Sequence, residues 1–138
     1  MSITTTQLTR MAGLSAIVAG LLFISVQINH PTLTLEFLTT TEFAVRQSMK
    51  VGFTVLALAG ISGMYLSQVR KSGMAGLVGY LIFATGLLAM LTIEVVGLVI
   101  LPAITSSAPG YVSDVLAVAT GGKAAGDIGL MKTLSLLS

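Results

Sequence analysis

The chain has 138 residues, of which 54% are hydrophobic and only 9% are charged. Because a water-soluble domain usually carries about 25% charged residues, this composition excludes a soluble surface and indicates one integral membrane domain, residues 1–138. The pI of 9.2 rests on a net charge of only +2 from scattered basic residues, so we expect a lipid bilayer and no nucleic acid as partner. The absence of cysteine excludes disulfides, thiolate metal sites and a cysteine nucleophile.

The first predicted membrane-spanning helix covers residues 8–29. The segment Thr4–Gln7, with the sequence TTTQ, has the pattern of a capping box at its start. Pro31 ends the helix, because a residue before proline is pushed out of the helical region. A cleaved signal peptide is the alternative, since a charged start precedes an apolar run. No small-x-small cleavage site follows, and the run exceeds the usual length of about 7–15 residues, so we expect an uncleaved helix.

Small residues recur along the predicted helices at spacings that allow a second helix to approach closely. Ala12, Ala16 and Gly20 fall four residues apart on one face of the first helix, which is the small-xxx-small pattern of helix packing in lipid. Further candidate packing residues in the later helices are Gly60, Gly63 and Gly79. The chain contains 15 glycines, and this abundance is typical of helices that pack closely in a membrane.

A polar connection, residues 31–41, leads to the second predicted spanning helix, residues 46–69. The leucines of the connection and Phe37 are available to lie on the bilayer surface. The pattern TTTE at Thr39–Glu42 predicts a second capping box. The helix that it begins is expected to be about 43 Å long. That length exceeds the hydrocarbon layer, so the first two turns are expected in the headgroup region.

Residues 74–101 form the third predicted spanning helix. From Met74 to Ile93 the segment carries no charge, and twenty residues at about 1.5 Å each match a hydrocarbon core of roughly 30 Å. The turn before it holds Arg70 and Lys71 and is so short that the second and third helices must be antiparallel neighbours. Because cytoplasmic loops are enriched in Lys and Arg, we expect this turn and the N-terminus to lie in the cytoplasm.

Two shorter helices are expected after the third span. Residues 110–120 place Val112, Val115 and Leu116 on one face, which predicts an amphipathic helix across the outer ends of the spans. Residues 127–138 have a helical pattern, but twelve residues cover only about 18 Å and do not cross a bilayer. The predicted fold is therefore an all-α membrane protein with three transmembrane helices, an outer amphipathic helix and an incomplete C-terminal helix.

Glu94 interrupts the third predicted span and is the most informative side chain. A carboxylate within a transmembrane segment costs a few kcal/mol and normally faces protein or water with a partner. By helical rise Glu94 lies about 12 Å before the end of its span, at a depth comparable to Lys50, with Arg46 one turn above Lys50. We expect a structural pairing of Glu94 with one of these cations. The alternative is a group that handles protons or cations.

His30, at the outer end of the first helix, completes a candidate intramembrane polar cluster of Glu94, Lys50, Arg46 and His30. As the only histidine it cannot form a metal site alone. A helix-end role is expected, and pH sensing is the alternative because imidazole changes its charge near neutral pH. The sequence contains no zinc-protease, nucleophile-elbow or nucleotide-binding motif. We therefore expect no catalytic residue, no metal, no cofactor and no enzymatic activity.

The phrases AGLLFISVQINHP, ISGMYLSQVRKSG, GLVGYLIF and ILPAITSSAPGY resemble the N-terminal part of uncharacterised multi-pass membrane proteins common in Gram-positive bacteria. The resemblance covers nearly the whole chain and rests on helix ends rather than on catalytic motifs. It implies a bacterial inner-membrane protein whose longer relatives continue through further helices. It brings no activity and no functional residue with it.

These observations predict a small subunit or fragment that acts through helix association, in a larger membrane assembly or a homo-oligomer. Its expected partners are lipid and either a second copy or another membrane chain. The alternative function is a small transporter or channel component that uses Glu94 as its proton or cation site.

Overall fold

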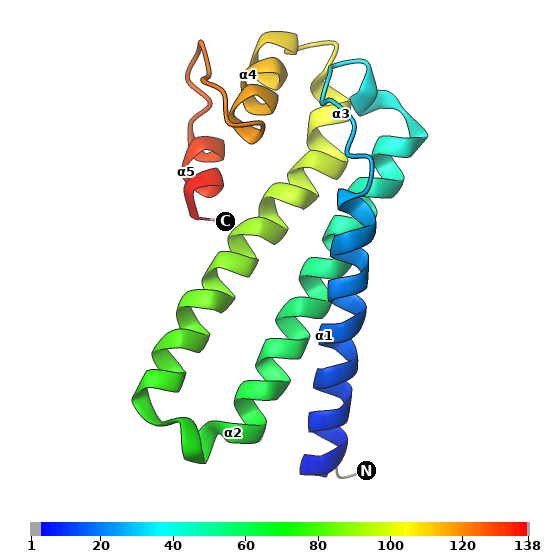
Figure 1. Cartoon of the computed structure of the whole chain (residues 1–138). Helices are drawn as coiled ribbons and strands as arrows, with labels where there is room; N and C mark the ends of the chain where they lie inside the picture. Colours follow the sequence, from blue (N-terminus) through cyan, green and yellow to red (C-terminus); the bar gives the residue numbers. More distant parts are fainter. Residues whose placement is uncertain (1–3, 138) are drawn as a thin grey trace.

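The computed structural model describes residues 4–137, and throughout that range the regular structure is helical. The elements in chain order are α1 (Thr5–Gln27), the 3₁₀ turn η1 (Phe37–Thr39), α2 (Thr41–Val95), the π-helix η2 (Val96–Ile100), α3 (Leu101–Ile104), α4 (Pro109–Ala119) and α5 (Leu130–Leu137). α2 folds back on itself, so that the molecule is a long, narrow bundle with α3, α4 and the η1 loop gathered at one end (Figure 1).

The reversal inside α2 depends on a single residue, Gly73. Its backbone has φ 57° and ψ −159°, a combination that is essentially restricted to glycine. Gly73 divides α2 into a first arm, residues 41–72, and a second arm, residues 74–95, which run in opposite directions (Figure 1). The short cationic turn expected from the sequence is thus reduced to one non-helical residue.

Two helical stretches, Thr5–Gln27 and Thr41–Ile104, are long and apolar enough to cross a membrane. Core helices of soluble proteins share this property, but they are mostly buried. Here only 17% of the most apolar stretch of the first helix and 22% of that of the second are buried within the chain. Most of the apolar surface of these helices is therefore left uncovered by the chain itself.

α1 packs along α2 through small residues. A Cβ placed on Gly60 would lie 3.2 Å from Ala16 N, and one on Gly63 would lie 2.7 Å from the Cβ of Ala12. These contacts involve the expected packing residues Ala12, Ala16, Gly60 and Gly63.

Two other candidate packing residues, Gly20 and Gly79, lie outside this contact. A Cβ on either would meet nothing within 4 Å. The residues of α1 that are buried recur every seven positions, at Ala12, Ala19 and Val26. A seven-residue seam matches the period of helices that cross at a small angle, whereas a spacing of four drifts around the helix, so that Gly20 lies at the exposed edge of the contact with α2.

The main hydrophobic core lies at the end of the bundle opposite the Gly73 turn. We call it the cap core, and its buried members are Leu38, Phe43, Leu101, Val112, Val115, Leu116, Ile128 and Met131. Val112, Val115 and Leu116 belong to the predicted apolar face of α4. The connection before α2 contributes as well, since Leu33, Leu35 and Phe37 pack against this core. These side chains were expected on the bilayer surface. They are instead half-buried against the cap core, where η1 contacts α2 and α3.

The helix starts follow the sequence in one case and differ in another. At α1 the capping box of Thr4 and Gln7 is confirmed, since Gln7 N donates to Thr4 Oγ1 and Thr4 N donates to Gln7 Oε1. At α2 the prediction that Thr39 begins a capping box is wrong. Thr40 is the N-cap and accepts a hydrogen bond from Phe43 N, while Thr39 belongs to the preceding 3₁₀ turn.

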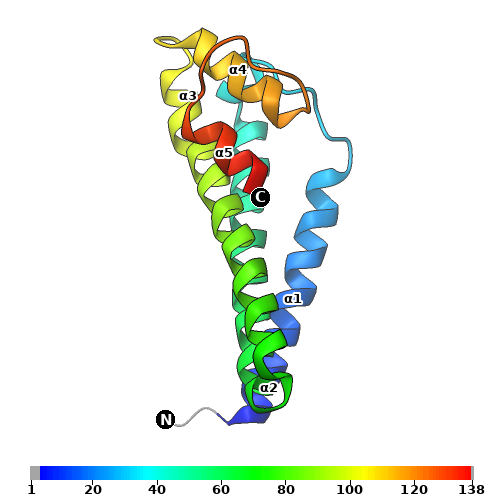
Figure 2. The same cartoon turned by 90° about the vertical axis from the view of Figure 1, so that its left-hand side faces the viewer.

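α5 returns from the cap along the second arm of α2 (Figures 1 and 2). Near its end, Leu137 O lies 3.5 Å from the position of a Cβ on Gly86. The helix begins at Leu130 rather than at residue 127, because Gly129 adopts φ 53° and Asp127 accepts a hydrogen bond from its N–H. Residue 138, the expected end of this helix, lies outside the described residues.

Candidate functional site

A cavity of about 300 Å³ lies beneath the cap, with walls from both arms of α2, from α4 and from α5. Apolar side chains of α4 and α5, such as Leu116 and Met131, form part of its wall. Its polar lining residues are His30, Gln47, Lys50, Glu94, Thr120 and Ser135. Three of the four members of the predicted polar cluster thus face one space.

Glu94 is buried in this site, with 8% of its surface exposed, and so is Gln47 with 5%. Gln47 Nε2 donates a hydrogen bond to Glu94 Oε2 and another, of 3.0 Å, to the backbone oxygen of Glu94. One neutral amide therefore fixes both the carboxylate and the backbone of Glu94. The first arm of α2 supplies the amide and the second arm supplies the carboxylate, so the hydrogen bonds also hold the two arms together.

The backbone after Glu94 accommodates this contact. Residues Val96–Ile100 form a π-helix, closed by a hydrogen bond from Leu101 N to Val96 O. Such π-helical insertions are rare in proteins, and those that occur are frequently found at functional sites. Gly97 lies within it, and a Cβ there would lie 2.6 Å from Gln47 Nε2. Glycine at this position leaves the room that the Gln47 amide needs beside Glu94.

The expected ion pair of Glu94 with Arg46 or Lys50 is not formed. The single ion pair within residues 4–137 joins Arg46 Nε to Glu42 Oε1 at 2.9 Å. Arg46 Nη1 also donates to the backbone oxygens of Val26 and Ile28, at 3.2 Å each. Arg46 therefore binds the end of α1 and does not line the cavity, because Glu42 one turn earlier and the free carbonyls of α1 lie on its side of the helix.

Lys50 and His30 occupy different parts of the cavity. Lys50 is half-buried and lines the same cavity as Glu94. His30 is exposed, and its Nδ1 lies 3.1 Å from the backbone oxygen of Pro31. His30 thus lies at the exposed edge of the site, three residues beyond the end of α1.

No family model, curated protein or solved structure matches this chain. The functional argument therefore rests on the geometry of the chain itself. Within the described residues, no three His, Asp or Glu side chains gather as metal ligands. What the site offers is one carboxylate and one ammonium group at the surface of a partly apolar cavity.

Two residues of the site, Gln47 and Gly97, were not predicted from the sequence. Gln47 stands three residues before Lys50, which places both on one helix face. A neutral amide is nevertheless an inconspicuous residue at the start of an apolar helix. Gly97 stands three residues after Glu94, in η2. These two spacings could have indicated that Gln47 and Gly97 belong to the site, but only the fold shows that the two helix faces meet.

Proposed function

We propose that this chain is an integral membrane protein with three spanning helices, namely α1 and the two arms of α2. Large apolar side chains project from them, among them Ile17 with 63% of its surface exposed, Leu21 with 60% and Ile82 with 70%. Exposing such apolar surface to water is unfavourable in free energy, whereas exposing it to lipid is not. The 23 residues of α1 measure about 34 Å, which fits a bilayer core of roughly 30 Å.

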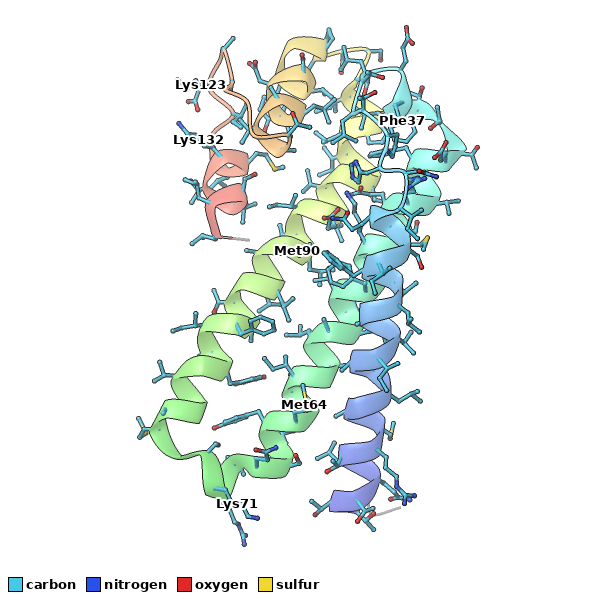
Figure 3. All side chains as sticks on the ribbon, in the orientation of Figure 1. Phe37, Met64, Lys71, Met90, Lys123 and Lys132 are labelled. Atoms are coloured by element: carbon cyan, nitrogen blue, oxygen red, sulfur yellow. The ribbon has the colours of Figure 1, made fainter. Side chains whose placement is uncertain are left out.

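The proposed orientation places the Gly73 turn and the N-terminus in the cytoplasm of a bacterium. Lys71 lies at the end that also holds the start of α1, whereas Lys123 and Lys132 lie at the opposite end (Figure 3). The charged residues at the proposed cytoplasmic end are all cations, namely Arg10, Arg70 and Lys71, whereas those at the proposed outer end have both signs. This distribution supports the orientation through the positive-inside rule.

We propose further that the protein acts through helix association, as a subunit of a homo-oligomer or of a larger membrane assembly. One observation supports this most strongly. An apolar groove of about 310 Å³ runs between α1 and α2, and small residues line it, among them Ala16, Ala19, Gly20 and Ala57. Small residues let a helix backbone approach closely in lipid. The proposal assigns no catalytic role and no cofactor to the chain.

The oligomeric state tests this proposal. The full chain is purified in several mild detergents and in nanodiscs, and its mass is measured by light scattering against the monomer mass of 14.2 kDa. A multiple of that mass, or a complex with another membrane protein, is expected. Gly20→Leu fills the groove and should dissociate the oligomer. Ala59→Leu is the control, because Ala59 is exposed and does not line the groove. A monodisperse monomer under every condition contradicts the proposal.

The cavity around Glu94 favours a second candidate function, a small transporter or channel component. Ionisable side chains inside a membrane commonly mark ion or proton pathways, and Glu94 faces a cavity rather than lipid. If Glu94 carries protons or cations, Glu94→Gln should abolish a pH- or ion-dependent flux in proteoliposomes and leave the fold intact. An unchanged flux in this variant, or no flux in the native protein, removes this candidate.

A further inference from the structure

The cavity beneath the cap contains a carboxylate oxygen that the protein leaves available. Gln47 engages Glu94 through Oε2 and through the backbone oxygen. The other carboxylate oxygen, Oε1, accepts no hydrogen bond from the described residues. Oε1 is not fully buried, because Ser72 Oγ is the one fully buried side-chain oxygen or nitrogen without a partner among those residues. Glu94 is thus fixed by one oxygen and presents the other to the cavity.

The cavity also contains a cation that the protein leaves available. In the part of the chain that the structure describes, Lys50 Nζ forms no ion pair and no hydrogen bond with a side chain or a backbone oxygen. The side chain is half-buried and lines the same cavity as Glu94. Lys50 comes from the first arm and Glu94 from the second, so the two charges lie on different walls of one space.

Two separated charges in a partly apolar cavity are costly unless each acquires a partner. Direct pairing is the simplest solution, but Lys50 and Glu94 do not form an ion pair. A molecule that carries both an ammonium and an anionic group would satisfy both charges at once. A cavity of about 300 Å³ stands at the lower end of small-molecule sites, which measure about 300–1,000 Å³. That volume suits a molecule the size of a lipid headgroup or an amino acid.

We propose that this cavity binds a small zwitterion, with its ammonium group on Glu94 Oε1 and its anionic group on Lys50. Two sources share this chemistry, the phosphoethanolamine headgroup of a membrane lipid and a free amino acid. In either case the apolar wall from α4 and α5 covers the carbon chain of the ligand, and the exposed His30 is part of the lining. The inference rests on the Glu94 site of the second candidate function. It requires neither flux nor helix association.

Calorimetric titration of the full chain in an uncharged maltoside detergent tests the proposal. The probes are phosphoethanolamine and L-leucine, which carry both charges, and ethanolamine and inorganic phosphate, which carry one each. At least one zwitterion should bind about tenfold or more tightly than either single-charge probe. Binding of phosphoethanolamine alone identifies the lipid headgroup as the source, and binding of L-leucine alone identifies the amino acid. If neither zwitterion exceeds the single-charge probes, the proposal is overturned.

Charge-removing variants locate the site. Glu94→Gln and Lys50→Met should each weaken zwitterion binding by about tenfold or more. Lys71→Met, at the other end of the bundle (Figure 3), should leave it unchanged. If a site variant does not fold, as judged by its circular dichroism, the comparison of the four probes on the native chain decides alone. Unchanged binding in both folded variants overturns the assignment.

The same preparation separates this inference from the proposed functions. A monomer that binds a zwitterion contradicts helix association and supports the binding site. A protein that binds a zwitterion without any flux in proteoliposomes contradicts transport and supports the binding site. Equal binding of ethanolamine and of the zwitterions overturns the inference and leaves a simple cation site at Glu94.

Discussion

Adding one methyl group at Gly63 tests the close contact between α1 and the first arm of α2. The new Cβ would lie 2.7 Å from the Cβ of Ala12, whereas ordinary contacts begin at 3.4 Å, so α1 must retreat by about 0.7 Å. Overpacking of this kind typically costs about 1–3 kcal/mol. Replacing a helical glycine by alanine contributes about 0.5–1 kcal/mol in the opposite direction. The net change for Gly63→Ala is therefore a loss of about 0–2.5 kcal/mol in the free energy of unfolding.

The free energy of unfolding can be measured by titrating the protein with SDS in mild-detergent micelles and following its circular dichroism. Gly79→Ala is the matched control, because a Cβ there meets nothing within 4 Å, and it should stabilise by about 0.5–1 kcal/mol. Ala12→Gly in the Gly63→Ala background removes the clashing methyl group and should restore stability, as expected for residues in contact. If Gly63→Ala stabilises the protein as much as Gly79→Ala does, the two helices are not as close as described.

Three further predictions concern the turn, the orientation and the end of α1. Gly73→Ala should destabilise by about 1–3 kcal/mol in the same SDS titration, because alanine is strained at this backbone conformation; an unchanged midpoint contradicts this. Since the chain has no cysteine of its own, single cysteines at the exposed positions Met74 and Ser107 report orientation. An impermeant thiol reagent on intact cells should label position 107 and not 74, and the reverse pattern inverts the topology. Arg46→Met should cost about 1 kcal/mol per lost hydrogen bond to α1 and should speed amide exchange in the last turn of α1; unaltered exchange there argues against this role.

The helices of this fold were largely predictable, because their signals are local. The capping pattern at Thr4 and the apolar length of residues 74–93 each depend on neighbouring residues only. The start of α2 shows how far such patterns reach. The pattern TTTE fits an N-cap at Thr39. Thr39 belongs to the 3₁₀ turn, however, and the N-cap of α2 is Thr40. Adjacent threonines offer the same hydroxyl, so the preceding chain decides between them.

The partners of the polar residues were not predictable in the same way. Equal depth in two antiparallel helices suggested an ion pair between Glu94 and Lys50, but depth does not fix rotation about the helix axis. The rotation brings Gln47 onto Glu94 and sends Arg46 to the end of α1. The π-helix after Glu94 further rotates the residues that follow it about the helix axis. No pattern in the sequence predicts this π-helix.

The position of the cap core explains why the polar cavity lies where it does. In the proposed membrane placement, apolar side chains gain little by leaving lipid for protein, so α1 and α2 meet through small residues such as Ala12 and Gly63. In the same placement the capped end of the bundle meets water, and there the hydrophobic effect gathers residues such as Leu116 and Met131 into a core. These two side chains also line the cavity that holds Glu94. The cap therefore buries the carboxylate, and a change that opens the cap should expose it without altering the packing of α1 on α2.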